Sequence, residues 1–312
     1  MSQRFTLGLI GNPNCGKTTV FNALTGSRQR VGNWPGVTVE RVSGEYSQAG
    51  NTFEVVDLPG TYSLDVTDQE VSLDEQVARS YAQEQTTHLV VNVVDASNLE
   101  RNLYLTTQLA EMQVPLLLAV NMTDVAADKG MKVDTALLAQ KLGCPVVSLA
   151  AASGKGVAEL KQAIAQAAVA PQTTALVPHY EPALEQAVER LLPLLADAPS
   201  PRWLAVRLFE GDALAQKSAP PAALAAAKAE AAALGDDIDI MVADARYGLA
   251  NQLAAAAVHH SGRIGRDLTE RIDRIVLNRV LGIPIFLLMM YLMFMFTINI
   301  GGAFIDFFDI LG

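Results

Sequence analysis

The chain has 312 residues, enough for two domains of ordinary size, and half of them are apolar. Its formal net charge is −10, which disfavours RNA or DNA as a partner because phosphate backbones repel an acidic surface. Two cysteines, Cys15 and Cys144, are too few for a disulfide framework and favour a reducing, cytosolic location. The first residues lead straight into an apolar run, so we expect no signal peptide.

Short β-rich runs alternate with helical patterns from residue 4 to about residue 170. Strands are predicted at 5–10, 37–46, 52–57, 88–94, 115–120 and 145–149. Helices are predicted at 17–25, 72–84, 100–112, 133–142 and 155–168. This alternation predicts an α/β fold, a doubly wound and mostly parallel sheet covered on both faces, as the domain of residues 1–170. Such folds bind ligands at the carboxyl ends of their strands, where the motifs described next all fall.

The first motif is Gly11-Asn12-Pro13-Asn14-Cys15-Gly16-Lys17-Thr18, which matches G-x-x-x-x-G-K-[ST], the phosphate-binding P-loop. Its backbone amides and the following helix N-terminus are expected to hold phosphate oxygens. Lys17 is expected to reach the β- and γ-phosphates, and the Thr18 hydroxyl to bind Mg²⁺. A Gly-rich turn without a ligand is the alternative, and the strand–loop–helix context argues against it. The expected nucleotide contacts here are Asn12, Pro13, Asn14, Cys15, Gly16, Lys17, Thr18 and Thr19.

Residues 31–38 contain two glycines and a proline, which predicts a mobile loop after the first helix. Thr38 is expected to supply a second hydroxyl to Mg²⁺ and to sense the γ-phosphate, with Gly36 and Val37 beside the nucleotide. Taken alone, Thr38 would more simply open the next strand. Its position after a P-loop favours the metal-binding interpretation.

Val55-Val56-Asp57-Leu58-Pro59-Gly60 matches the D-x-x-G element of GTPases at the end of an apolar strand. Asp57 is expected to hold Mg²⁺ through water, and the Gly60 amide to meet the γ-phosphate. Asp57 as a mere turn residue is the alternative. Thr61 stands where many GTPases carry a water-orienting Gln. Hydrolysis is therefore expected to be slow unless a backbone group, an ion or a partner assists.

Asn121-Met122-Thr123-Asp124 is the N-x-x-D form of the guanine-specificity element, although these could be turn residues after a strand. The Asp124 carboxylate can accept hydrogen bonds from guanine N1–H and the 2-amino group, and adenine would leave it unpaired. Asn121 is expected to tie this loop to the P-loop. A last loop carries Ala150, Ala151 and Ala152, where a backbone amide would contact guanine O6.

These four elements in this order resemble the small-GTPase superfamily, within the group of translation-factor-related GTPases. The whole chain is similar to the FeoB family of bacterial ferrous iron transport proteins. The stretches that carry the likeness are residues 11–18, 31–40, 57–64 and 95–103, of which Gly32 to Glu40 and Asp95 to Leu103 are specific to that family. Relatives often carry Ser or Ala where Cys15 stands, and the Ala-rich last loop lacks a central Ser or Thr.

The resemblance implies an activating ion. Asn14 matches the asparagine of potassium-activated GTPases, in which K⁺ is held by that side chain and by carbonyls that match Gly32 and Trp34. Such an ion stabilises charge that develops between the β- and γ-phosphates, as an arginine finger does elsewhere. The alternative is that Asn14 only braces its loop. The implied substrate is GTP, the cofactors are Mg²⁺ and K⁺, and Asn14, Lys17, Thr38 and Gly60 are expected to act in hydrolysis.

A linker at 171–178 is expected to open a small all-α domain over residues 171–265. Apolar residues recur at helical spacing between 184 and 195 and between 238 and 253, and the Ala-rich run 222–234 favours a helix. His259 and His260 would point apart on a helix, so we expect a solvated helix end, not a metal site. The resemblance implies that this domain couples the GTPase to the membrane part.

The pattern of residues 266–282 predicts an amphipathic juxtamembrane segment, and that of residues 283–312 predicts the start of a transmembrane region. No charged residue occurs from Val280 to Ile305, a stretch of about 39 Å as a helix against a hydrocarbon core of about 30 Å. The arginines before it predict that the first 280 residues lie in the cytoplasm and that the protein is anchored in the bacterial inner membrane. A permeation path needs several packed helices, so a longer transporter is expected.

The interpretation is thus a GTP-binding and GTP-hydrolysing cytoplasmic part of a ferrous iron transporter. GTP would order residues 31–39 and the segment after Asp57. Its partners would be GTP and GDP, the lipid bilayer, the remaining transmembrane domain and ferrous iron, with homo-oligomer formation left open. One alternative is a soluble ribosome-assembly GTPase acting on RNA, which the acidic balance and apolar tail disfavour. Another is a nucleotide-sensing module with negligible catalysis, which fits the missing Gln.

Overall fold

The computed structural model describes residues 3–26, 29–34, 37–64, 73–83, 87–174, 176–235, 237–260 and 282–311. The chain divides into two units, Met1–His260 and Ser261–Gly312, and each is described by itself. The predicted juxtamembrane segment lies, except for Gly282, outside the described residues, as does Gly36 among the expected nucleotide contacts.

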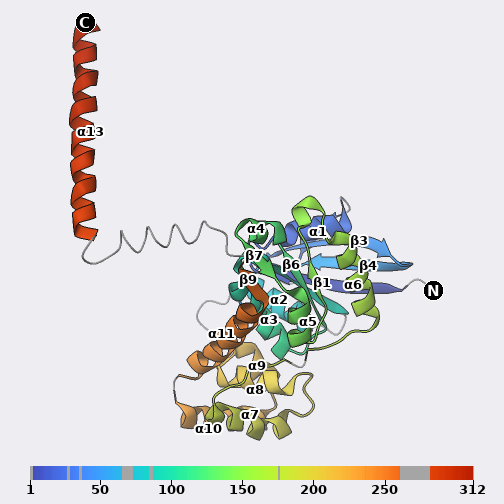
Figure 1. Ribbon diagram of the computed structural model, residues 1–312. Helices are drawn as coiled ribbons and strands as arrows, with labels where there is room; N and C mark the ends of the chain where they lie inside the picture. Colours follow the sequence, from blue (N-terminus) through green and yellow to red (C-terminus); the bar gives the residue numbers. More distant parts are fainter. Residues whose placement is uncertain are drawn as a thin grey trace. The chain divides into compact units, whose positions relative to one another are not determined.

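A seven-stranded sheet of order β2-β3-β4-β1-β5-β6-β8 forms the centre of the first unit (Figure 1). The pairs β1–β4, β1–β5, β5–β6 and β6–β8 are parallel, and only the edge pairs β2–β3 and β3–β4 are antiparallel. This confirms the predicted mostly parallel sheet. The strands are β1 Arg4–Gly11, β2 Gln29–Asn33, β3 Glu40–Gln48, β4 Asn51–Asp57, β5 Leu89–Asp95, β6 Leu116–Asn121 and β8 Val146–Ser148.

Helices cover both faces of this sheet, because its central strands carry apolar residues on both sides. On one face, Leu7 and Leu9 share a buried cluster with Phe21 of α1 and residues of α6. On the other face, Ile10 shares a cluster with Leu109 of α3 and residues of α2 and α5. The helices of this part are α1 Lys17–Thr25, α2 Leu73–Gln83, α3 Leu99–Glu111, α4 Thr123–Asp128, α5 Thr135–Leu142 and α6 Val157–Val169, with the short 3₁₀ turns η1 Ala96–Asn98 and η2 Ala151–Ser153.

Strand β2 corrects the predicted loop at residues 31–38. Residues 29–33 form an edge strand antiparallel to β3, and β3 itself begins at Glu40, not at residue 37. Every residue of β2 is exposed, so no apolar alternation marks the strand in the sequence. Its backbone hydrogen bonds to β3 hold it in place. Thr38 lies in the turn between the two strands.

A helical part follows, with the helices α7, α8, α9 and α10 gathered together below the sheet in Figure 1. As its spacing predicts, Leu184, Val188, Leu191 and Leu195 are all buried. The core of this part is continuous with the α3 face of the sheet, and Tyr247 of α11 stacks on Tyr104 of α3. The elements are α7 Pro182–Leu191, η3 Leu192–Leu195, α8 Pro201–Phe209, α9 Ala213–Ser218, α10 Pro221–Leu234 and α11 Ile238–Ala257.

The predicted linker at 171–178 is anchored to the sheet-containing part. The Thr174 side chain is buried, and its hydroxyl donates to the carbonyl of Leu142. The Gln113 side chain donates to the Thr174 carbonyl at 2.9 Å. These bonds fix the position at which the helical part begins.

The end of this unit corrects the expectation for His259 and His260. Residues Val258–His260 form strand β9, which pairs antiparallel with β7, Met131–Val133. His259 and His260 are exposed, as expected, but they lie in a strand and not at a helix end, so the described part of this domain is not purely helical. At the end of α11, the Asp134 amide donates to the Ala257 carbonyl at 2.8 Å, and strand β7 then pairs with the backbone groups of β9.

The second unit contains helix α13, Gly282–Leu311, of 30 residues. Large apolar side chains between Ile283 and Ile298 are exposed within that unit. Among the described residues, we find no helix with both the length and the apolar character required to cross a membrane. The membrane span expected from the sequence stays a prediction.

Candidate nucleotide-binding site

The P-loop connects β1 to α1 at the carboxyl end of the parallel strands. Its path needs two left-handed residues, Asn14 with φ 66° and Gly16 with φ 83°. A Cβ atom at Gly16 would overlap the side-chain amide of Asn121, and one at Gly11 would overlap the Val93 carbonyl. Glycine is therefore required at both positions, because there is no room for a side chain.

A cleft of about 570 Å³ beside this loop brings together Lys17 and the three residues predicted to bind Mg²⁺, Thr18, Thr38 and Asp57. Two hydroxyls and a carboxylate are hard oxygen ligands of the kind that Mg²⁺ prefers. The donor set present in the cleft therefore fits the metal that the motifs imply.

Lys17 and Asp57, which both line the cleft, form an ion pair, with side chains only 12% and 13% exposed. Burial raises the pKa of Asp57 above its ordinary value, and the neighbouring Lys17 ammonium opposes that rise. In this arrangement each group neutralises the other. A triphosphate that binds Lys17 and a metal ion that binds Asp57 would together replace this ion pair.

Asn121 joins the P-loop to the two loops expected to read the base. Its side-chain amide donates to the Cys15 carbonyl at 3.0 Å, and its side-chain oxygen accepts from the Ala151 amide at 3.0 Å. The tie predicted from the sequence is thus present. A parallel bond runs from the Thr123 hydroxyl to the Leu149 carbonyl at 3.0 Å. The three loops form one hydrogen-bonded unit.

Asp124 lies in the first turn of α4 with an exposed side chain. One carboxylate oxygen accepts from the Val125 amide at 3.0 Å. Met122 precedes the helix with φ 59°, the left-handed turn that directs the chain from β6 into α4. In the last loop, Ala150 and Ala151 are buried, whereas Ala152 is exposed.

The three residues implied for K⁺ lie on different elements. Asn14 lines a polar cavity of about 220 Å³ that neither Gly32 nor Trp34 lines. Gly32 pairs with Arg41 in the β2–β3 ladder. The Trp34 ring is buried edge-on against Tyr81 with centroids 5.4 Å apart, and its carbonyl accepts from the Val37 amide at 3.3 Å.

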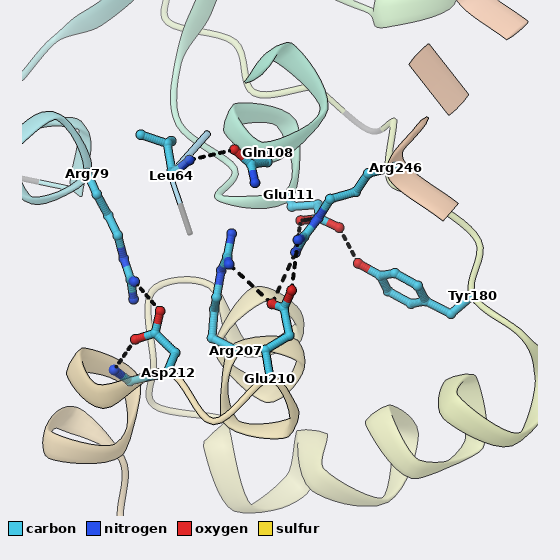
Figure 2. Close-up of polar contacts among 10 residues, drawn as sticks. Leu64, Arg79, Gln108, Glu111, Tyr180, Arg207, Glu210, Asp212 and Arg246 are labelled. Carbon is cyan, nitrogen blue, oxygen red and sulfur yellow. Dashed lines mark hydrogen bonds and ion pairs between the residues drawn. The ribbon is translucent and has the colours of Figure 1, made fainter. Parts of the chain in front are cut away.

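Sequence reasoning missed a set of polar residues buried between α2, α3 and the helical part (Figure 2). Arg207 and Arg246 are only 1% exposed, although each stands in an apolar helix. A charged residue in the middle of an apolar run was the available signal, because such a residue is rarely buried unless it is paired. Arg246 binds Glu111 and Glu210, which are distant in the chain and could not be paired with it from spacing, whereas Arg207 binds Glu210, three residues further on.

In a mostly parallel sheet, the phosphate loop follows β1, D-x-x-G follows β4 and N-x-x-D follows β6, and a helical domain comes after the sheet. This arrangement is that of a P-loop GTPase. The family model described as ferrous iron transport protein B matches residues 5–164. The model described as the FeoB cytosolic helical domain matches residues 180–259. The chain belongs to the FeoB family of ferrous iron transport proteins.

Known relatives agree with this family. The Fe(2+) transporter FeoB of Escherichia coli K12 is 45% identical over 312 residues, which are 99% of this chain and 40% of that protein. The chain therefore spans about two fifths of the length of the curated relatives it matches. The cytosolic domain of L. pneumophila FeoB has a TM-score of 0.71 and 35% identity, covering 81% of this chain and 99% of that one. A mutant S. thermophilus NFeoB bound to GDP has a TM-score of 0.72 and 38% identity, covering 82% and 100%.

Proposed function

We propose that this chain binds GTP in the cleft beside the P-loop, hydrolyses it slowly, and forms the cytoplasmic part of a bacterial inner-membrane ferrous iron transporter. The observation that carries the proposal is the convergence of Lys17, Thr18, Thr38 and Asp57 on one cleft. Two relatives support it: the S. thermophilus protein is described as bound to GDP, and the E. coli protein as an Fe(2+) transporter.

Phosphate binding would use groups that the fold already positions. Lys17 would exchange its contact with Asp57 for the β- and γ-phosphates. The Thr61 amide donates to the Gly11 carbonyl at 3.2 Å, which keeps the neighbouring Gly60 amide beside the P-loop. Thr18, Thr38 and Asp57 would hold Mg²⁺, which when bound neutralises charge on the phosphate oxygens.

Base selection would rest on Asp124. Its carboxylate is exposed and can accept from guanine N1–H and the 2-amino group. The Ala151 amide is already engaged by Asn121, so we assign the contact with guanine O6 to the next amide, that of Ala152. Asn121 would act by holding the base loops against the P-loop.

The test is a comparison of nucleotide affinities. The wild type is expected to prefer GTP over ATP, and Asp124→Asn to shift preference toward xanthosine triphosphate, whose 2-oxo group pairs with an amide. Asp128→Asn is the matched control, because it removes the same charge from the same exposed helix. A wild type that binds no guanine nucleotide in the presence of Mg²⁺ refutes the proposal.

Potassium activation is the finer part of the proposal. Asn14 and the carbonyls of Gly32 and Trp34 would supply oxygen ligands suited to K⁺, and the Trp34 carbonyl at present accepts from the Val37 amide. Thr61 offers no general base, so an ion is a reasonable source of charge stabilisation. Turnover is expected to fall severalfold when Na⁺ replaces K⁺. Equal rates in both salts would contradict this role.

Membrane attachment is proposed for the second unit. Helix α13 exposes large apolar side chains between Ile283 and Ile298, and in the sequence the uncharged stretch continues to Ile305. We assign residues 1–170 to the GTPase domain, 171–265 to the helical domain, 266–282 to a juxtamembrane segment and 283–312 to the start of the membrane region. Alkaline phosphatase fused after residue 312 should be active outside the cytoplasm, and inactive when fused after residue 260. Activity at neither point would refute the span.

A further inference from the structure

The end of the D-x-x-G element lies against the P-loop. The Thr61 amide donates to the Gly11 carbonyl at 3.2 Å. Gly60 is close to Pro13, because a Cβ atom added at Gly60 would lie 3.5 Å from the Pro13 Cα atom. On the proposed function, the Gly60 amide meets the γ-phosphate. A contact that holds residues 60–62 in place therefore also holds this amide in place.

Tyr62 connects this segment to the first turn of α3. The Arg101 guanidinium lies over the Tyr62 ring, 4.3 Å from its centroid, and both side chains are exposed. Among the described residues, no carboxylate or carbonyl pairs with this guanidinium. The aromatic ring is thus the partner that the structure gives to this cation, through an attraction between the charge and the ring face.

The backbone of Arg101 is bound to the P-loop at the same time. Its carbonyl accepts from the side-chain amide of the buried Asn12 at 3.4 Å. Arg101 and Tyr62 also line one polar cavity of about 220 Å³ together with Asn14, the residue expected to hold K⁺. One residue of α3 therefore contacts the P-loop through its backbone and the D-x-x-G segment through its side chain.

The residue after Gly60 makes this placement important. Thr61 stands where many GTPases carry a water-orienting Gln, so hydrolysis here depends on backbone donors and ions. A hydrogen-bond donor stabilises the charge of a transition state most when the protein holds it in position before the reaction begins. Groups that fix the Gly60 amide are therefore expected to influence the rate of hydrolysis.

We propose that Arg101 is a positioning residue for GTP hydrolysis: its guanidinium holds Tyr62, and thereby the Gly60 amide, in place for the γ-phosphate. The inference rests on the proposed function. GDP has no γ-phosphate, so this contact acts on the rate of hydrolysis and not on the affinity for GDP. The attraction between a cation and an aromatic ring at an exposed site is modest and corresponds to a change of about two- to fivefold in rate.

The experiment compares the wild type with Arg101→Met in single-turnover GTP hydrolysis, with protein in excess and with Mg²⁺ and K⁺ present. Methionine removes the charge, and the bond from Asn12 is kept because its acceptor belongs to the backbone. The rate is expected to fall about two- to fivefold. GDP affinity, measured by titration of the same proteins, should stay near that of the wild type. Arg101→Lys keeps a cation and should restore most of the rate.

A double-mutant cycle tests whether Arg101 acts through the ring. Tyr62→Leu should slow hydrolysis to a similar degree, and the double variant should be no slower than the slower of the two single variants. Lys161→Met is the matched control, because it removes a cation that lies 5.2 Å from the Tyr46 ring centroid. Neither of these two residues lines the cleft or the cavity beside Asn14, so the control should hydrolyse GTP at the rate of the wild type.

An unchanged rate in Arg101→Met overturns the inference, and so does an equal loss in Lys161→Met. It is also overturned if Arg101→Lys is as slow as Arg101→Met, if the losses in the cycle are additive, or if GDP affinity falls as much as the rate does. A wild type that binds GTP without hydrolysing it refutes the proposed function, and the inference with it.

Discussion

Replacing Asn121 with alanine removes the only described side chain that bonds both the P-loop and the last base loop. The Cys15 carbonyl loses a donor, and the Ala151 amide loses an acceptor. Asn121 is 3% exposed, so solvent does not readily replace either partner. We expect the variant to fold but to hold its nucleotide loops less firmly.

The size of the effect follows from these two bonds. A hydrogen bond contributes about 1 kcal/mol net, and a buried group left without its partner costs about 1–3 kcal/mol. Two such groups are left, so the free energy of unfolding should fall by about 2–6 kcal/mol. If about 1.4 kcal/mol of this loss concerns loop order needed by the nucleotide, affinity falls about tenfold.

Urea unfolding and GDP titration measure the two effects. Thr123→Val is the matched control, since it keeps the side-chain shape and deletes one bond between the same base loops without touching the P-loop. It should cost about 1 kcal/mol of stability and leave nucleotide affinity nearly unchanged. A loss for Asn121→Ala no larger than that of the control would refute the reasoning.

Three further predictions concern the cleft. Gly16→Ala should lower GDP affinity by about tenfold because its Cβ would overlap Asn121, whereas Gly26→Ala, which also has a positive φ but open space around its Cβ, should not; equal titrations would contradict this. Because burial raises the pKa of Asp57, the folded state binds this proton more tightly than the unfolded chain. The free energy of unfolding of the wild type, measured with urea relative to Asp57→Asn, should therefore fall as the pH rises above about 4. A difference between the two proteins that does not change with pH would count against this reasoning. Burial raises the pKa of the Cys15 thiol to about 11, so iodoacetamide should label it only after unfolding, as read by mass spectrometry; rapid native labelling would be inconsistent.

Most of the sheet could be predicted because its strands are short apolar runs between turn signals. β1, β4, β5 and β6 carry apolar side chains toward both covered faces, so composition alone marks them. The fully exposed β2 has no such pattern, and β7 and β9 are three residues each. Strands of that kind depend on a partner elsewhere in the chain, which a local pattern does not reveal.

The phosphate and base loops could be predicted for a related reason. Each lies directly after a strand or before a helix, and its chemistry is set by backbone shape and a few fixed side chains. The tie from Asn121 to the P-loop follows from that arrangement, and the structure contains it. The pair Lys17–Asp57 does not follow, because the motifs describe a loaded site in which both groups face ligands.

The family-specific stretch from Asp95 to Leu103 forms the start of α3 and contacts the P-loop. Its side chains shape the start of α3: Asp95 accepts from the Ser97 amide at 2.7 Å, and Asn102 donates to the Asn98 carbonyl at 2.9 Å. Asn12 of the P-loop donates to the Arg101 carbonyl at 3.4 Å, so α3 begins against the phosphate loop.

The same helix ends against the helical part, through Glu111 and Arg246. Helix α3 is thus held at both ends by the parts it joins, whereas α2 is held to the helical part through Arg79 and Asp212. A substitution of Glu111 by alanine would leave the buried Arg246 with one carboxylate partner fewer, so it should lower the free energy of unfolding.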